Sequence, residues 1–456
     1  MTLKEAVAAR QEELLRRLQE SIRIPSVEGA PEEGAPYGRE VCRCLDHALA
    51  TAEALGLTCG QMDHQVGWCE YGEGEEMVAV VGHLDVVPAG EGWTFDPFGG
   101  EIRDGKVFGR GSMDDKGPTV AAMYALAALR DIGAPLRRRI RLLLGTNEET
   151  GSQDMKYYLA HGGERPVLGF TPDGEYPVIN GEKGIINVTF RKTYDQTGPV
   201  RLVRLTGGSA PNVAPASAAA EIACPPETAK EIAARTAEKI RCTVTDTGVT
   251  VEARGVSAHG STPELGENAI GRLVQFLKDV PLTGGAAEAV SFLAGRLGME
   301  TDGASLGIAL EDEVSGRLTL NWGTAEADAH SLSLCINYRY PVTKRFEDCA
   351  PQLEAAFAEA GFNLEKQTHK QSLYVPEDSE LVRTLLDVYA RETGLPAQPK
   401  SIGGGTYAKA LPNVVAFGPI FPGDEVREHK PDEFIEVEKL MKNAQIIAEA
   451  MYQLAK

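Results

Sequence analysis

The sequence predicts an α/β protein that is interrupted by an inserted α+β segment. Three observations predict this class. Short apolar runs alternate with helical stretches over the first part of the chain, and extended segments interleave with helices in the middle. The alternation of the first part returns near the end. We therefore expect a discontinuous domain of residues 1–183 and 377–456, with residues 184–376 as a separate inserted domain.

The elements of the first part follow from apolar spacing and helix-end signals. Thr2 and Glu5 form a capping box, after which apolar residues recur at helical spacing as far as Pro25. The later segments predict, in chain order, a helix over 39–55, a strand over 77–81, a helix over 116–132, and strands over 140–144 and 167–170.

The remaining elements are predicted in the same way. In the inserted domain we expect strands over 185–190 and 249–253 and helices over 227–240, 268–280 and 346–360. The final part predicts a helix over 379–393, a glycine-rich turn at 403–405, a strand over 414–417 and a closing helix over 435–454. The turn is not followed by Lys-Ser or Lys-Thr, which disfavours a phosphate-binding loop.

Composition and charge restrict the function. The 456 residues carry 46 Lys and Arg against 66 Asp and Glu, a net charge of −20, which disfavours nucleic acid and membrane surfaces as partners. The densely charged opening residues suit neither a signal-peptide core nor a membrane span, so we expect a cytoplasmic protein. The eight cysteines form no CxxC pair, and Cys42 and Cys44 suit neither a zinc knuckle nor a thioredoxin-type motif, which favours reduced, structural thiols.

Histidine and acidic residues follow several of the predicted strands. His83 and Asp85 come directly after the strand over 77–81 and share one side of the backbone, so one could ligate a metal and the other orient it. A structural His–Asp pair is the alternative. An acid pair at 114–115 precedes a predicted helix, where an N-cap is the alternative, and a second pair at 148–149 follows a buried strand.

Two further segments complete the pattern. Asp173 follows the strand over 167–170, and His429 lies in the acidic segment 428–433. Each cluster taken singly is explained by structure alone. Together they place five His, Asp and Glu clusters beyond the strand ends of one α/β domain, which is where the ligands of open sheets gather.

These motifs resemble the di-zinc aminoacylase/carboxypeptidase metallopeptidases, and most closely the PepV-type (Xaa-His dipeptidase-like) dipeptidases. The matching segments are in the right order and spread over nearly the whole chain: Gly82–Pro88, Gly109–Gly117, Asn147–Gly151, Pro172–Gly174 and Glu428–His429. The resemblance implies a zinc-peptidase-like catalytic domain with helices on both faces of a central sheet, plus an inserted α+β lid domain. Segment 430–433 departs slightly from the family pattern.

The resemblance also implies the parts of the site. Five residues would hold two divalent metal ions, Zn or Mn: His83 and Asp173 the first, Glu149 and His429 the second, and Asp114 both. Asp85 would brace His83, Glu148 would act as the general base, and His259 of the lid would donate a hydrogen bond to the tetrahedral oxyanion. The substrate would be bound by residues of the lid and of the glycine-rich turn: Asn212, Arg339, Gly404, Gly405 and Thr406. A loop or capping role is the alternative for His259, and a surface ion pair is the alternative for Arg339.

The expected activity is metal-dependent hydrolysis of the amide bond of unblocked dipeptides, with a small peptide as the partner. An N-acyl amino acid deacylase or desuccinylase of the same family is one alternative, and a non-catalytic metal- or peptide-binding relative is another. The inserted segment of about 190 residues resembles the PepV arrangement, in which one chain supplies what a dimer partner supplies elsewhere, so we expect a monomer.

Overall fold

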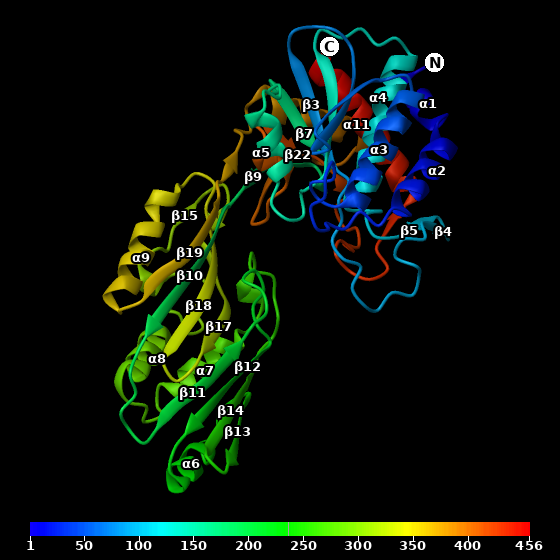
Figure 1. The fold of residues 1–456 in the computed structure, drawn as a ribbon. Coiled ribbons are helices and arrows are strands. Elements are labelled where there is room, and N and C mark those ends of the chain that lie inside the picture. The colour runs from blue at the N-terminus through cyan, green and yellow to red at the C-terminus, as the bar shows by residue number, and fades with distance from the viewer. Residues whose placement is uncertain (236) are drawn as a thin grey trace. The chain divides into compact units, whose positions relative to one another are not determined.

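A computed structural model describes residues 1–235 and 237–456 of the chain. The chain divides into two compact units (Figure 1). Unit 1 consists of Met1–Asn180, Val375–Lys400 and Gly405–Lys456, and unit 2 consists of Gly181–Tyr374 and Ser401–Gly404. Unit 1 combines a mixed sheet, parallel at its centre, with helices, and unit 2 an antiparallel sheet with helices, which confirms the predicted fold class.

The sheet of unit 1 is built around parallel strands. Its strands follow in the order β1 (Thr58–Met62), β2 (Val66–Tyr71), β6 (Arg139–Gly145), β3 (Met77–His83), β7 (Leu168–Thr171), β22 (Val414–Ala416) and β9 (Val178–Glu182). Strands β20 (Leu373–Tyr374) and β21 (Pro399–Ile402) pair with β9; all of β20 and the last two residues of β9 and of β21 belong to unit 2. Strand β3 pairs in parallel with both β6 and β7, and β7 pairs in parallel with β22. The carboxyl ends of these four strands therefore meet at one edge of the sheet.

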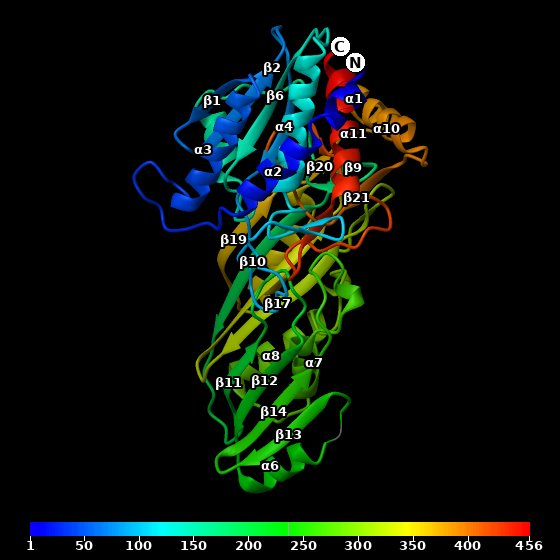
Figure 2. The same ribbon diagram turned by 90° about the vertical axis from the view of Figure 1, so that its right-hand side faces the viewer.

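Seven helices of unit 1 pack around this sheet: α1 (Leu3–Ala8), α2 (Gln11–Ile22), α3 (Arg39–Ala54), α4 (Lys116–Asp131), α5 (Gln153–Ala160), α10 (Glu380–Thr393) and α11 (Val437–Ala455). Helices α1 and α11, which lie at the two chain ends, are in contact (Figure 2). A small antiparallel sheet of β4 (Glu101–Arg103), β5 (Lys106–Phe108) and β24 (Phe434–Glu436) joins distant parts of the chain.

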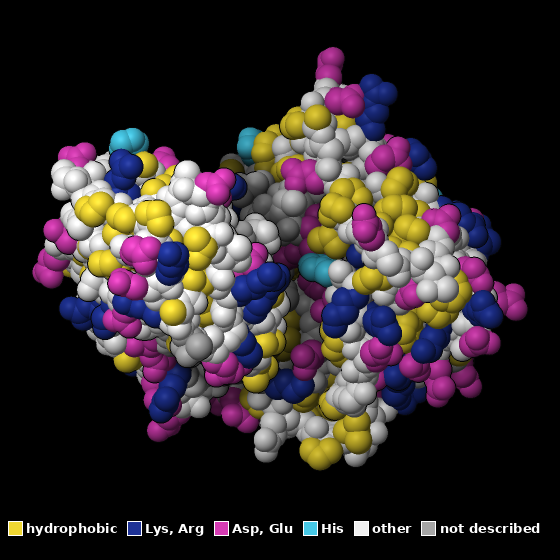
Figure 3. Space-filling model, turned by 90° about the horizontal axis from the view of Figure 1, so that it is seen from below, with side chains coloured by type: hydrophobic (Ala, Val, Ile, Leu, Met, Phe, Trp, Pro, Cys, Tyr) yellow, Lys and Arg dark blue, Asp and Glu magenta, His cyan; other side chains and the backbone are white. Residues whose placement is uncertain are grey.

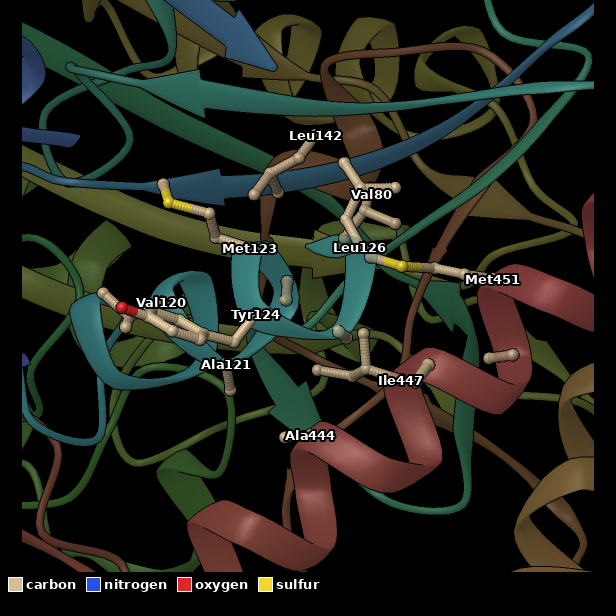
Figure 4. Close-up of a cluster of buried hydrophobic side chains, with 14 of the residues drawn as sticks. Val80, Val120, Ala121, Met123, Tyr124, Leu126, Leu142, Ala444, Ile447 and Met451 are labelled. Atoms are coloured by element: carbon tan, nitrogen blue, oxygen red, sulfur yellow. The ribbon is translucent and has the colours of Figure 1, made fainter. Parts of the chain in front are cut away.

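Helix α4 forms the centre of the core of unit 1. Residues 116–129 of this helix are all buried, because the sheet covers one side and α11 another. A helix that is apolar all round is expected in such a place. Figure 4 shows Met123 and Leu126 of α4 facing Val80 and Leu142 of the strands, with Ala444, Ile447 and Met451 of α11 on another side of the helix; Val120 and Tyr124 extend to a further side. This packing fixes the ends of β3 and β6.

Unit 2 contains an eight-stranded antiparallel sheet. Its order is β13 (Ile240–Thr245), β14 (Gly248–Arg254), β12 (Ser217–Ala223), β11 (Arg201–Gly207), β17 (Thr319–Ala327), β18 (Ser331–Tyr340), β10 (Gly184–Thr193) and β19 (Asn363–Lys370). The helices of this unit are α6 (Pro226–Ala233), α7 (Ala269–Leu277), α8 (Gly284–Arg296) and α9 (Ala350–Glu359). Inward residues alternate along β10, and Phe190 stacks on Phe357 of α9 with ring centroids 4.1 Å apart.

Several local expectations were wrong. The helix predicted over 227–240 ends at Ala233, and Ile240 begins strand β13, whose β-branched residues favour a strand; residue 236 lies outside the described residues. The opening helix is two helices, α1 and α2, and the segment 346–360 begins with a 3₁₀ turn before α9. Helix α8 was not predicted from the sequence.

The surface carries acidic and basic side chains interspersed with apolar ones on the face shown in Figure 3. No helix in the described parts of the chain is both long and apolar enough to cross a membrane.

Candidate metal centre

The strand ends of unit 1 bring the predicted ligands together. Strand β3 ends at His83, and its neighbour β7 ends two residues before Asp173. Strand β6, on the other side of β3, leads into the loop that carries Glu149. Asp114 lies two residues before α4, and His429 lies in the loop that precedes β24. These separate segments converge because the strands are parallel neighbours.

The ligand atoms form two groups that share Asp114. In the first group, Nε2 of His83 lies 3.0 Å from Oδ1 of Asp114 and 3.8 Å from Oδ2 of Asp173. In the second, Nε2 of His429 lies 3.0 Å from Oδ2 of Asp114 and 3.1 Å from Oε2 of Glu149. Within each group the ligand atoms lie within 4.8 Å of one another. Asp114 thus presents one carboxylate oxygen to each group.

The charges and unpaired atoms of the centre fit divalent cations. Burial raises the pKa of Glu149, and the Asp114 carboxylate raises it further. Oε1 of Glu149 is buried and has no hydrogen-bond partner among the residues that the structure describes. Hydrogen bonds to Asp114 and Glu149 raise the pKa of His429 to about 11. Cations bound among these nitrogen and oxygen donors would offset the excess negative charge, and the donor set suits zinc or manganese.

Asp85 contacts both the first histidine and the glutamate loop. Nδ1 of His83 lies 3.0 Å from the main-chain carbonyl oxygen of Asp85 and 3.5 Å from its Oδ1. The carboxylate of Asp85 accepts hydrogen bonds from the N–H groups of Glu148 at 3.2 Å and Glu149 at 3.1 Å. Asp85 therefore orients the histidine mainly through its carbonyl, and its carboxylate holds the backbone of both glutamates.

A second buried carboxylate holds the preceding part of the same loop. Oδ2 of Asp154 accepts hydrogen bonds from the N–H groups of Thr146 at 2.7 Å and Asn147 at 3.1 Å, and from the hydroxyl of Tyr407. Burial raises the pKa of Asp154 to about 6. Four consecutive amide groups, 146 to 149, are thus bound by two buried aspartates. Sequence reasoning did not identify Asp154, although an acid six residues after the first Glu of the pair was visible.

Comparison with known proteins identifies the family. The model of "Peptidase family M20/M25/M40" matches residues 79–453. The chain belongs to peptidase family M20/M25/M40. The metallopeptidase resemblance read from the motifs is thereby confirmed.

Individual M20/M25/M40 relatives match over nearly the full chain. "Putative dipeptidase YtjP" of Bacillus subtilis (strain 168) is 38% identical, over 99% of both chains. "Beta-Ala-Xaa dipeptidase" of Lactobacillus delbrueckii subsp. lactis is 34% identical, over 100% of this chain and 99% of the relative. Among solved structures, the M20 family metallo-carboxypeptidase Sso-CP2 from Sulfolobus solfataricus has the same fold, with a TM-score of 0.60 at 16% identity over 97% of this chain and 99% of that one.

A buried ion pair, which sequence reasoning missed, holds the turn of Asp114, the residue that the two candidate ligand groups share. Oε1 of Glu433 accepts hydrogen bonds from the N–H groups of Gly111 at 3.0 Å, Met113 at 2.9 Å and Asp114 at 3.2 Å. Its Oε2 binds Nη1 of Arg110 at 2.5 Å, and both side chains are at most 1% exposed. Glu433 therefore fixes the turn that presents Asp114. Its position four residues after His429 was the available signal.

Four of the residues predicted to act on the substrate from outside the metal centre lie in unit 2: Asn212, His259, Arg339 and Gly404. His259 is exposed, its Nδ1 lies 2.6 Å from Oγ of Ser261, and its backbone pairs with Val213 in an antiparallel bridge. The carbonyl of Asn212, also exposed, accepts a hydrogen bond from the N–H of Gly260 at 2.7 Å. The two segments that carry Asn212 and His259 are therefore joined to each other within this unit.

Arg339 is the buried member of the set. It lies in β18 with 3% of its surface exposed, donates from Nε to Oδ1 of Asn337 at 3.2 Å, and donates from Nη1 to the carbonyl of Gly403 at 2.5 Å. Burial lowers its pKa to about 10. The predicted glycine-rich turn is divided: Gly404 belongs to unit 2, whereas 405 and 406 belong to unit 1. The hydroxyl of Thr406 accepts a hydrogen bond from the N–H of residue 408.

Proposed function

We propose that this chain is a metal-dependent dipeptidase that hydrolyses the amide bond of unblocked dipeptides. The observation that carries the proposal is Asp114, whose two oxygens face two separate histidines, as a ligand shared by two cations requires. The names of the two relatives, "Putative dipeptidase YtjP" and "Beta-Ala-Xaa dipeptidase", support the substrate class. The proposed ligands are His83, Asp114, Glu149, Asp173 and His429, and the proposed metals are two Zn or Mn ions.

The proposed chemistry divides between the cations and the chain. Two bound divalent cations would supply Lewis acidity, polarising the scissile carbonyl and acidifying the attacking water. Glu148 takes the proton from that water and returns it to the leaving amine. Asp85 supports this role because it fixes the N–H of Glu148, and so the direction in which the side chain leaves the backbone.

Residues outside the metal centre are proposed to bind the dipeptide. Arg339 would bind the free carboxylate, helped by main-chain N–H groups at 404–406, because a guanidinium pairs with a carboxylate through parallel hydrogen bonds. His259 would donate a hydrogen bond to the carbonyl oxygen as negative charge develops there, and Asn212 would bind the substrate backbone. We also propose a monomer as the active species, which sedimentation of the active enzyme tests.

Metal dependence is the first test. Dialysis against a chelator should abolish hydrolysis of alanyl-alanine, and Zn²⁺ or Mn²⁺ should restore it, whereas dialysis without chelator should change nothing. Full activity in chelated enzyme whose metal content is confirmed as zero would overturn the proposal. Binding of two ions without turnover of any substrate would favour the non-catalytic alternative.

Substrate class is the second test. Alanyl-alanine, N-acetyl-alanine and N-acetyl-alanyl-alanine share side chains but differ in the free amine and in the amide that can be cleaved. We expect release of alanine from the first compound only, measured by product chromatography. Faster hydrolysis of N-acetyl-alanine would instead establish the deacylase alternative within the same family.

A further inference from the structure

A third group of metal-ligating side chains lies in unit 1 and shares no residue with the centre described above. It consists of Cys42, Asp46 and His64, whose Sγ, carboxylate and imidazole atoms lie within 4.8 Å of one another. The two groups of the metal centre offer only nitrogen and oxygen donors, whereas this group adds a thiol. Its donor chemistry therefore differs from that of the metal centre.

Local structure explains why these side chains meet. Cys42 and Asp46 lie four residues apart in α3, so they occupy one face of that helix. His64 lies in the turn between β1 and β2, and α3 contacts both strands (Figure 2). The backbone of His64 has a φ of 52°, and its N–H donates to Oε1 of Gln61 at 2.7 Å. The turn therefore holds the imidazole in a defined place beside the helix.

The distances suit a tetrahedral metal ion. Sγ of Cys42 lies 4.0 Å from Oδ2 of Asp46, and Nε2 of His64 lies 3.5 Å from Oδ1 of the same carboxylate. Zinc bonds of about 2.3 Å to sulfur and about 2.0–2.1 Å to nitrogen and oxygen separate neighbouring ligands by roughly 3.3–3.6 Å. The separation from His64 lies within this range, and the separation from Cys42 exceeds it by a few tenths of an ångström, which side-chain rotation can close.

We propose that Cys42, Asp46 and His64 form a third metal site, selective for a thiophilic divalent cation such as Zn²⁺. Solvent takes the fourth position, because the side chains of Asp46 and His64 are 58% and 30% exposed. The ion ties α3 to the β1–β2 turn. The residue after His64 extends this connection, since the carbonyl of Gln65 accepts a hydrogen bond from the hydroxyl of Thr146, at the start of the Glu148 loop.

Cobalt substitution isolates this site from the metal centre. A thiolate bound to Co²⁺ produces a ligand-to-metal charge-transfer band in the near ultraviolet, and nitrogen and oxygen donors do not. Metal-free enzyme titrated with Co²⁺ should develop this band, and Zn²⁺ should remove it. Cys42→Ser should lose the band and bind one cobalt fewer per chain. Cys59→Ser, which removes a partly buried thiol of β1, is the matched control and should retain the band and the wild-type cobalt content.

The histidine tests whether the three side chains act together. His64→Ala should lose the band, whereas His161→Ala, which removes another imidazole of unit 1, at an exposed position, should keep it. No band in the wild-type enzyme, or equal cobalt content in wild type and Cys42→Ser, would overturn the proposal. A band that persists in His64→Ala would overturn the three-ligand site. Circular dichroism checks folding, and Asp46→Asn repeats the test if a variant misfolds; none of these readouts depends on peptidase activity.

Discussion

The candidate metal centre of unit 1 and the proposed substrate-binding residues of unit 2 are built differently. In unit 1, buried carboxylates bind the main chain that carries the proposed ligands and the proposed base: Asp85 and Asp154 hold the glutamate loop, and Glu433 holds the turn of Asp114. In unit 2, His259 and Asn212 lie on exposed segments. Of the three residues proposed to bind substrate there through their side chains, only Arg339 is buried.

The difference separates two ways of placing a functional group. A functional side chain whose backbone is fixed from several sides is preorganised before substrate arrives, so removing it should strongly lower the rate of the chemical step. A residue on an exposed segment contributes only when substrate is bound, so removing it should lower activity less. The following predictions test this ranking, from the largest expected effect to the smallest.

Removal of the proposed base should have the largest effect. Glu148→Gln keeps the size of the side chain but cannot accept the proton, so we expect kcat to fall by about 10³-fold. Metal content, measured by mass spectrometry of the metals, should remain at the wild-type value because Glu148 is not one of the proposed ligands. Glu53→Gln, at an exposed position of α3, is the control. Near-normal kcat in Glu148→Gln would exclude Glu148 as the base.

Asp154 should make the stability of unit 1 depend on pH. Its pKa is about 6 in the folded protein, above the ordinary value of 3.8, because burial disfavours the charged form. The folded state therefore keeps this proton between these two pH values while the unfolded state has released it, so stability falls as pH rises from about 4 to 6 and levels off above. The lost stability is about 3 kcal/mol.

Asp154→Asn isolates that contribution. Asparagine does not titrate, so the unfolding free energy of the variant relative to wild type should rise by about 3 kcal/mol across the same pH range. Denaturant unfolding of both metal-free proteins measures this difference, in which the shared titrating groups cancel. A constant difference across the range would show that Asp154 has an ordinary pKa, and would weaken the contrast between the two units.

The sequence predicted the fold class and the segments that converge at the candidate metal centre because both depend on local patterns. Strand ends at His83 and near Asp173 are visible as apolar runs followed by ligand-type residues. Contacts between distant segments were not visible: Glu433 binds a turn more than 300 residues earlier. No local period encodes such a contact, because it depends on how the chain returns to β24.

The same reason limits what the sequence shows at two other places. The sequence places Cys42 beside Cys44, whereas ligand atoms of Asp46, one helical turn away, and of His64, in another element, lie within 4.8 Å of its sulfur in the fold. The helix predicted over 227–240 is too long, because no residue directly after Ala233 signals a helix end in the sequence. In the structure α6 ends at Ala233 and β13 begins at Ile240. Tertiary pairing of β13 with β14 decides that boundary.

Loss of the exposed histidine of unit 2 should have a smaller effect than loss of Glu148. His259→Ala removes a donor to the developing oxyanion, which predicts a fall in kcat of about 10²-fold with little change in KM. His330→Ala, at another exposed position of unit 2, is the control and should leave kcat unchanged. If His259→Ala lowered kcat as much as Glu148→Gln, the proposed ranking of the two units would be wrong.

Arg339 is buried, but it is proposed to bind the substrate's free carboxylate and not the amide that is cleaved, so its loss should show the smallest effect, and that effect should appear in substrate binding. Two of its donors already bind Asn337 and Gly403, which leaves Nη2 and the second N–H of Nη1 for a carboxylate. Lysine offers no such pair of donors, so Arg339→Lys should raise KM by about tenfold. Arg317→Lys, at an exposed position of the same unit, is the control.

Alanyl-alanine amide tests the contact itself: it lacks the carboxylate, so Arg339→Lys should change the kcat/KM for this substrate little. An equal loss for the acid and the amide would show that Arg339 supports the structure of β18 and does not bind the substrate's carboxylate.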